Sequence, residues 1–257
     1  MYPYIRIFGN VYGTYGLCIL LGFFLAGFLS LRKGKSIGFE IEHLLIIGTT
    51  TLGSALLGGG LLYVFVTYPL EYIWERIREL DFSFLVSGIV FYGGLIGGFF
   101  GALLGRKIAK CDFRIVERSV VPFIPIGHAI GRVGCVMGGC CHGFAYDGFC
   151  ALYYPNSVVG LDPNQGYFPV QLLEGLINLC ICVALLLLDK RIKRKWNLLF
   201  SYLAMYAVSR FFLELLRGDE IRGIFGGLST SQYISLGLLA ISIAGIFWRK
   251  HAQSEVE

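Results

Sequence analysis

The chain has 257 residues, of which 56% are hydrophobic and 15% charged, and its formal net charge is +5. Soluble domains usually contain about 45–50% apolar and about 25% charged residues, so the composition excludes an ordinary soluble fold. The positive charge does not imply a nucleic-acid partner, because the basic residues lie in short clusters directly after apolar runs, where they act as topology signals.

Seven apolar stretches are long enough for transmembrane helices, each of which needs about 20 residues to cross a hydrocarbon layer of about 30 Å. The stretches are 14–31, 43–66, 85–104, 115–134, 169–188, 197–216 and 228–248. They predict an all-α polytopic membrane protein, with a single membrane-embedded domain over 1–257 and an external loop at 136–168. The first helix is expected to remain as an anchor, because no cleavage site of small residues follows it.

All eight lysines lie in four basic clusters, at 32–35, 106–118, 190–195 and 249–250. Lysine and arginine accumulate in cytoplasmic loops, so these clusters predict a cytoplasmic C-terminus and an N-terminus outside. The opposite side has arginines but no lysine.

Ionisable residues cluster near the outer ends of the predicted helices. Such groups cost several kcal/mol at membrane depth and usually face a partner or water. They are His128, Arg132, Glu174, Arg210, Glu214 and Arg217. The three arginines favour binding of a phosphate, because guanidinium presents a planar fork of donors. A phospholipid head group is the expected anion.

Structural explanations for these residues remain open. Arg210 and Glu214 are spaced as an ion pair within one helix. Arg217 can extend its side chain to the membrane surface. His128 and Gln171 can serve only to join helices.

Four of the eight cysteines are close in sequence: Cys135, Cys140, Cys141 and Cys150. Their spacing lacks a paired C-x-x-C arrangement, so the sequence predicts no metal site. A disulfide, to Cys150 for example, is the alternative that an oxidising compartment favours. A catalytic thiol would require a nearby arginine to lower its pKa.

With these residues in view, the chain resembles the prolipoprotein diacylglyceryl transferases, which move a diacylglyceryl group from phosphatidylglycerol to a lipoprotein cysteine. The resemblance covers almost the whole chain. Its motifs are Tyr15-Gly16, Gly93-Gly94-Leu95-Ile96-Gly97, Gly131-Arg132-Val133-Gly134 running to Gly139 and Gly143, Pro169-Val170-Gln171-Leu172-Leu173-Glu174, and Tyr206, Arg210, Glu214 and Arg217. The glycine runs also suit close helix packing.

Three positions depart from the family pattern. Tyr92 stands where the family normally has a histidine, and Cys135 and Cys140 stand in place of an asparagine and a glutamate. The resemblance therefore implies that the arginines are kept and that the acid–base groups differ.

The resemblance implies diacylglyceryl transfer from phosphatidylglycerol to the cysteine of a prolipoprotein signal peptide, in the bilayer of a bacterial inner membrane, with the site toward the outer leaflet and no cofactor. The implied catalytic residues are Arg132, Arg210, Tyr92 and His142, with His142 preferred to His128 as the base. The implied substrate-binding residues are Tyr15, Gly93, Gly94, Gly143, Gln171, Glu174, Tyr206, Glu214 and Arg217. A transferase with another acceptor, a lipid-binding protein without turnover, and a redox or metal-handling protein remain alternatives.

Overall fold

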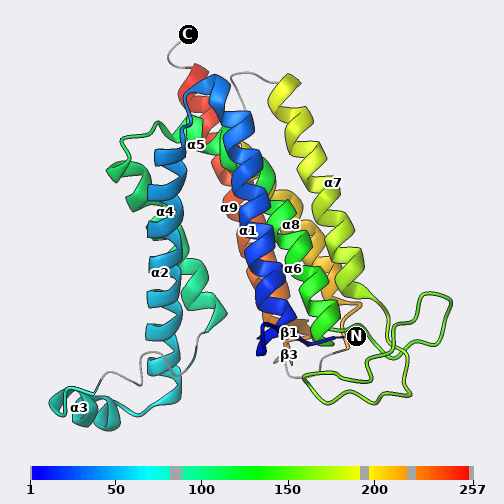
Figure 1. The fold of residues 1–257 in the computed structure, drawn as a ribbon. Helices are drawn as coiled ribbons and strands as arrows, with labels where there is room; N and C mark the ends of the chain where they lie inside the picture. The colour runs from blue at the N-terminus through cyan, green and yellow to red at the C-terminus, as the bar shows by residue number, and fades with distance from the viewer. Residues whose placement is uncertain (1, 82–87, 89, 192–196, 219–223, 255–257) are drawn as a thin grey trace. The chain divides into compact units, whose positions relative to one another are not determined.

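The computed structural model describes the chain except for residues 1, 82–87, 89, 192–196, 219–223 and 255–257 (Figure 1). The described chain forms two compact units, one made of residues 1–32 and 117–257 and the other of residues 33–116. Both units consist mainly of long helices, and the first also contains two short antiparallel hairpins.

The first unit contains the helices that come to hold the candidate site. They are α1 (Thr14–Gly34), α6 (Ile124–Gly138), α7 (Val170–Arg191), α8 (Leu198–Glu214) and α9 (Thr230–Ser254). The hairpins are β1 (Tyr4–Ile7) with β2 (Asn10–Gly13), and β3 (Ile224–Phe225) with β4 (Leu228–Ser229). In Figure 1, α1, α7 and α9 end at the top and α6 and α8 end at the bottom, so successive helices run in opposite directions.

Five helical segments of the described chain are long and apolar enough to cross a membrane. They are Thr14–Ile37, Ile41–Thr67, Phe113–Gly138, Val170–Lys190 and Thr230–Trp248. Large hydrophobic side chains cover their outer surfaces, and Phe24 and Leu57 are each 69% exposed. Lipid tails are as apolar as these side chains and cover them in a bilayer. The all-α polytopic membrane fold is therefore confirmed.

Two helices that the sequence predicts as spans are not among these five. Helix α8 has 17 residues, and α4 (Phe91–Ile108) carries Arg106 and Lys107 in its last turn. A total of seven crossings therefore stays a prediction, as does the orientation of the termini.

The fourth predicted helix, 115–134, is built from three pieces. Helix α5 (Phe113–Val120) leads through a 3₁₀ turn, η3 (Val121–Phe123), into α6. The predicted end at residue 134 was too early, because α6 continues to Gly138 and stops at Gly139, whose φ of 67° is left-handed. Glycine is the usual residue for such a helix end, because it lacks the Cβ that makes this conformation costly. This stop fixes where the cysteine-rich segment begins.

In the second unit, glycines allow α4 to lie directly against α2 (Ile41–Thr67). A Cβ at Gly93 would overlap the carbonyl oxygen of Gly58, and one at Gly97 would overlap that of Ser54. The packing explanation for the glycine runs thus has direct structural support, as expected for small residues between membrane helices.

Helix α3 (Leu70–Arg78) was not predicted from the sequence. Leu70 and Trp74 on it are 73% and 59% exposed, and the guanidinium of Arg78 lies 5.7 Å from the centre of the Trp74 ring. Its pattern of apolar, aromatic and basic residues suits a membrane interface. The apolar run of α3 is too short for a transmembrane span, so a prediction based on apolar runs of about 20 residues does not find this helix.

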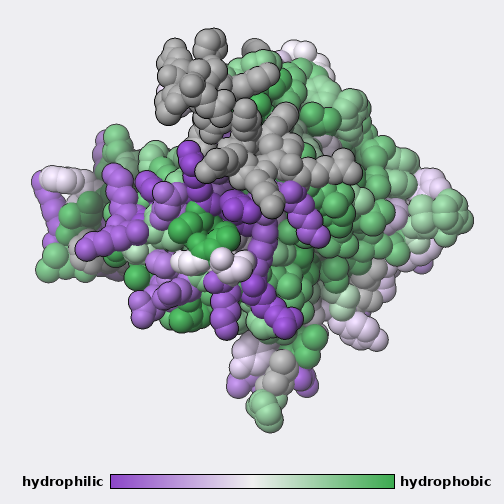
Figure 2. All heavy atoms as spheres, turned by 90° about the horizontal axis from the view of Figure 1, so that it is seen from above, coloured by the Kyte–Doolittle hydropathy of each residue, from purple (hydrophilic) through white to green (hydrophobic). Residues whose placement is uncertain are grey.

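A buried polar network closes the upper end of the first unit. The Glu117 carboxylate accepts a hydrogen bond from the backbone N–H of Leu199 at 2.9 Å, which satisfies the start of α8. Arg118 donates to Asp189 at 2.7 Å. Beneath these contacts lies a hydrophobic core that includes Leu185 and Tyr202. Seen from this end, hydrophilic residues gather on the surface (Figure 2).

Candidate functional site

Three helices of the first unit bring charged residues together at the opposite end from that network. Arg132 lies in the last two turns of α6, Glu174 is the fifth residue of α7, and Arg210 and Glu214 lie in the last two turns of α8. Because α6 and α8 end where α7 begins (Figure 1), these side chains meet at one level. Arg132 and Arg210 each keep no more than 14% of their side-chain surface exposed.

The carboxylate of Glu174 lies at the centre of this group. Its Oε1 accepts a hydrogen bond from Arg132 Nη2 at 2.7 Å and lies 3.4 Å from His128 Nε2. Its Oε2 lies 4.0 Å from Arg210 Nη1. The side chain is 2% exposed, so it serves as a buried counter-ion for two guanidinium groups.

A second carboxylate, Glu214, ties Arg210 to the start of α9. Arg210 Nη2 lies 2.6 Å from Glu214 Oε2, and the Ser229 hydroxyl donates to Glu214 Oε1 at 3.0 Å. Ser229 also accepts from the Gln232 N–H, while the Gln232 side chain accepts from the Ser229 N–H. This reciprocal pair is a capping box, which anchors the first turn of α9.

The charges of the group leave room for an anion. Arg132, Arg210 and Arg217 contribute three positive charges, against two negative charges on Glu174 and Glu214. Arg210 Nη1 is buried and donates no hydrogen bond among the described residues. A buried donor of this kind is costly unless a partner satisfies it. One negatively charged oxygen placed beside Nη1 would both balance the charge and accept that hydrogen bond.

The segment after α6 folds back sharply and gathers three thiols. Gly139 has a φ of 67° and Cys141 a φ of 56°, and the Cys140 N–H bonds the Cys135 carbonyl at 3.1 Å. The Sγ atoms of Cys135, Cys140 and Cys141 all lie within 4.8 Å of one another. None of the eight cysteines, all of which lie in the described part of the chain, forms a disulfide in the structure, so Cys150 is not bridged to this segment.

Two of the arginines also contact this thiol cluster (Cys135, Cys140 and Cys141). Arg132 Nη1 lies 4.0 Å from Cys135 Sγ, and Arg217 hydrogen-bonds Cys141. The pKa of the Cys141 thiol is lowered, first by hydrogen bonds from Cys135 and Cys140 and further by the positive charge of Arg217. These contacts favour the thiolate form of Cys141 over the thiol.

A buried glutamine holds the turn in place. Gln171 Nε2 donates to the Cys140 carbonyl at 2.8 Å and to the Tyr154 hydroxyl at 3.1 Å. Both side chains are 0% exposed. Gln171 thus joins α7, the cysteine turn and the loop that contains Tyr154.

Comparison with known proteins identifies the family of the chain. The family model for prolipoprotein diacylglyceryl transferase matches residues 4–248. The chain belongs to the prolipoprotein diacylglyceryl transferase family. It is 30% identical to phosphatidylglycerol–prolipoprotein diacylglyceryl transferase 2 of Clostridium perfringens, with 91% of this chain and 90% of the relative covered. It is 31% identical to the enzyme of the same name, without the number, from Clostridium tetani, with 93% of each covered. The resemblance drawn from the sequence motifs is thereby confirmed.

Gly143, predicted from the sequence as a substrate-binding residue, lies where three chain segments meet. Its N–H bonds the Phe168 carbonyl at 3.1 Å, and a Cβ on it would lie 2.9 Å from the Leu216 carbonyl oxygen. The adjacent His142 is 8% exposed and its Nδ1 lies 2.8 Å from the Gly143 carbonyl oxygen. A carbonyl can only accept, so Nδ1 carries the hydrogen and Nε2 the lone pair of a neutral ring.

Two tyrosines that were predicted to bind the substrate border the arginines. The Tyr206 ring lies 5.3 Å from the His128 ring, and Tyr206 is in electrostatic contact with Arg132 and Glu174. Tyr15, half exposed near the start of α1, approaches α6 where Gly134 has no side chain: a Cβ there would lie 3.2 Å from the Tyr15 Cα. Both hydroxyl-bearing rings thus belong to the first unit, with the arginines.

Three predicted site residues, Tyr92, Gly93 and Gly94, belong to the second unit. The Tyr92 side chain lies outside the described residues, and Gly93 packs against α2. A catalytic role for Tyr92 and a substrate-binding role for Gly93 and Gly94 stay predictions.

Sequence reasoning missed Tyr154, Ser229 and Gln232. Ser229 and Gln232 carried a signal, because serine followed three residues later by glutamine before an apolar run marks a capping box. Tyr154 had no such sequence signal, because the loop has no periodic pattern that would indicate which of its residues is buried.

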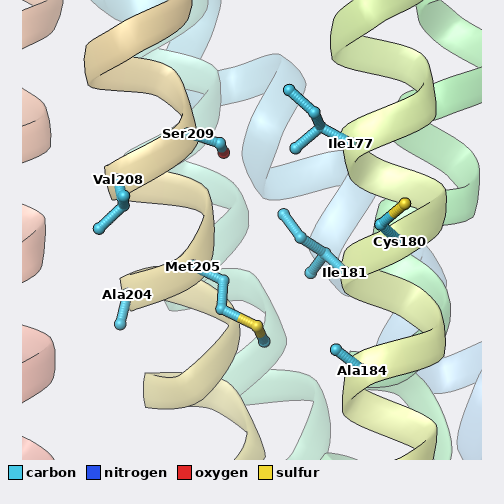
Figure 3. A pocket seen from close by; sticks show the side chains of 8 residues that line it. All are labelled: Ile177, Cys180, Ile181, Ala184, Ala204, Met205, Val208 and Ser209. Atoms are coloured by element: carbon cyan, nitrogen blue, oxygen red, sulfur yellow. The ribbon is translucent and has the colours of Figure 1, made fainter.

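An apolar groove runs between α7 and α8, from the arginine level toward the middle of both helices; Figure 3 shows the side chains that line it. Its volume is about 600 Å³, and it is lined by Ile177, Cys180, Ile181, Ala184, Ala204, Met205, Val208 and Ser209. Ser209 directly precedes Arg210, so one end of the groove adjoins the charged group.

Proposed function

We propose that this protein transfers the diacylglyceryl group of phosphatidylglycerol to a cysteine thiol of a prolipoprotein and forms a thioether. The observation that carries the proposal is the pair of buried arginines, Arg132 and Arg210, around the single carboxylate of Glu174. Together with Arg217 and the second carboxylate, Glu214, they leave one excess positive charge and a buried Nη1 donor. A phosphodiester monoanion has the charge and the oxygen atoms that such a site requires.

The lipid donor is positioned by its two chemically different ends. The phosphate lies against Arg132 and Arg210, while an acyl chain lies in the apolar groove between α7 and α8. A groove that is open to the bilayer and ends beside an arginine matches an amphipathic ligand. Phosphatidylglycerol can enter sideways from the membrane without leaving the lipid phase.

In the transfer step, the acceptor sulfur attacks the glyceryl carbon that bears the phosphate. The carbon–oxygen bond breaks, a carbon–sulfur bond forms, and glycerol phosphate leaves with the electron pair. Arg132 and Arg210 stabilise the charge that builds on the leaving phosphate, which is often the largest contribution to such a rate. The thiol proton passes to a base, for which His142 offers Nε2.

The remaining assignments belong to the same proposal. Tyr206 and Tyr15 donate hydrogen bonds toward the head group, and Glu174, Glu214 and Gln171 hold the binding groups in place. The single domain spans 1–257 of a multi-pass protein in the bacterial inner membrane. Its site faces the outer leaflet, the N-terminus lies outside, the C-terminus lies in the cytoplasm, and the signal peptide of the prolipoprotein approaches along the loop at 136–168.

The test is complementation in bacteria depleted of their own diacylglyceryl transferase, with lipoprotein modification followed by mobility shift. The parent chain restores modification and Arg132→Ala does not. Failure of the parent, inserted and folded in the membrane, would refute the proposal. In a purified assay, release of glycerol phosphate only with the cysteine peptide separates transfer from simple lipid binding and from another acceptor.

A further inference from the structure

We infer that Cys135, Cys140 and Cys141 form a three-thiolate zinc site whose open fourth position binds the acceptor thiol. The inference rests on the proposed function, because it names the group that prepares the acceptor for attack. The sequence spacing alone predicted no metal, since it lacks a C-x-x-C pair. The folded positions of the sulfur atoms lead to the opposite conclusion.

The distances between the sulfur atoms fit a tetrahedral zinc ion. With zinc–sulfur bonds of about 2.3 Å, two thiolate ligands lie about 3.8 Å apart. The three Sγ atoms lie within 4.8 Å of one another before any metal draws them in. The remaining difference is within what a rotation about the cysteine χ1 angles can close. The thiols already hydrogen-bond one another, so their side chains point to one centre.

The backbone that carries these sulfurs is shaped for this arrangement. Cys135 lies on the last turn of α6, and the chain reverses at Gly139 to bring Cys140 and Cys141 beside it. Cys141 keeps a φ of 56° although it has a side chain, which is a strained conformation that persists at functional sites when surrounding contacts enforce it. Gln171, fully buried, supplies such a contact through the Cys140 carbonyl.

The surrounding charges favour thiolates over thiols. Arg132 lies 4.0 Å from Cys135 and Arg217 hydrogen-bonds Cys141. Three thiolates and one Zn²⁺ carry one net negative charge beside the guanidinium groups of Arg132 and Arg217. With zinc bound, this charge takes up the excess positive charge of the three arginines, and the phosphate is then held by hydrogen bonds, including one from the buried Arg210 Nη1. Neighbouring cations of this kind are what a thiolate cluster at a membrane surface needs.

The number of ligands distinguishes a catalytic site from a structural one. Structural zinc sites have four protein ligands, whereas catalytic sites have three and leave a position for water or substrate. Among the described residues, the group of ligand atoms within 4.8 Å consists of these three cysteines and does not include His142. Cys140 and Cys141 are only half-buried, so the fourth position faces outward.

The open fourth ligand position accounts for the deprotonation of the acceptor thiol. A thiol that binds zinc loses its proton, because the metal stabilises the thiolate. That proton ends on the departing glycerol phosphate, so no oxidant or further reactant is needed. The sulfur attacks the glyceryl carbon, the carbon–oxygen bond breaks, and the thioether product is a weaker ligand that leaves the zinc. Arg132 contacts both Cys135 and Glu174, so the nucleophile and the phosphate site share one residue.

The first measurement is metal content. The reduced full-length protein is exposed to zinc ion in detergent, separated from free metal, and analysed by inductively coupled plasma mass spectrometry. One zinc per chain is expected for the parent and for Cys180→Ser, a control on the lipid-facing groove. The variant with Cys135, Cys140 and Cys141 all changed to Ser should hold none. A parent that holds no more zinc than this triple variant overturns the inference.

The second measurement tests the open position. Co²⁺ replaces zinc, and its thiolate charge-transfer and visible ligand-field bands are followed while a peptide with one cysteine is added. The bands change with this peptide and not with its serine analogue. Identical spectra with both peptides overturn a role in acceptor binding, even if metal is held.

The third measurement links metal to turnover without changing the chain. Chelation should reduce transfer by the parent by about 10²-fold to 10⁴-fold, the usual contribution of proton removal, and zinc should restore it. Full transfer by a zinc-free parent overturns the inference and leaves the proposed function intact. No transfer by a parent that holds zinc and binds the peptide refutes the proposed function and leaves the metal site.

Discussion

Replacing Glu174 with glutamine tests whether one buried carboxylate holds the arginine group together. The substitution keeps the size of the side chain and removes the one carboxylate among the described residues that contacts both Arg132 and Arg210. The new amide group also places N–H donors toward guanidinium groups that need acceptors. We therefore expect the fold itself, and not only catalysis, to weaken.

The expected size follows from the burial of Glu174. Breaking a buried ion pair by removing one partner costs about 3–5 kcal/mol. For a chain of this size each kcal/mol lowers the melting temperature by about 2–4 °C, so Glu174→Gln should lower it by about 6–20 °C. The measurement is thermal unfolding in detergent, followed by the helical circular dichroism signal.

A matched control uses the same substitution in an exposed pair. Glu79 Oε2 lies 3.9 Å from Arg76 Nη1 and its side chain is 67% exposed, so Glu79→Gln should leave the melting temperature unchanged. Adding Arg132→Gln to Glu174→Gln should recover part of the loss, because the buried charges balance again. A Glu174→Gln protein that melts with the parent would show that the arginines need no counter-ion, and the reasoning on charge would be wrong.

Three further predictions concern single side chains. Arg132→Lys should lower kcat/KM for glycerol phosphate release by about 10²-fold to 10³-fold, because one ammonium cannot serve Glu174 and the leaving phosphate together; an unchanged kcat/KM would argue against phosphate contact. Ser229→Ala should cost about 1–2 kcal/mol of unfolding free energy through loss of the α9 cap, seen as a lower melting temperature. In metal-free reduced protein, hydrogen bonds from Cys135 and Cys140 and the charge of Arg217 lower the pKa of Cys141, so its alkylation rate, followed by mass spectrometry, should level off at a lower pH than that of a free cysteine. Arg217→Gln should shift that profile to higher pH, and identical profiles would contradict the role of this arginine.

The fold could be predicted because the membrane imposes a length on each apolar run. The start of α7 and the level of Arg132, Glu174 and Arg210 along their helices followed from counting residues. Their mutual contacts did not, because counting gives the height of a residue and not the direction in which its helix faces. The shared role of Glu174 depends on how three helices are rotated against one another.

The thiol cluster shows a second limit of sequence reasoning. Spacing rules for metal sites assume a common turn geometry, and this turn has two left-handed residues, Gly139 and Cys141. The reversal brings Cys135 beside residues five and six positions later. The short helix α3 was not predicted for another reason. Its mixture of aromatic and charged residues lacks the long apolar run that marks a transmembrane span.

The left-handed backbone of Cys141 implies that thermal stability and transfer activity favour different residues at this position. A residue with a Cβ in this conformation costs about 1–2 kcal/mol more than glycine. Selection for heat resistance alone should therefore replace Cys141 with glycine, and the resulting protein should outlast its parent while losing one sulfur of the cluster. A library of variants at residue 141, screened first for resistance to heating and then for transfer activity, would reveal whether the cysteine is needed for the reaction although it lowers the stability of the protein.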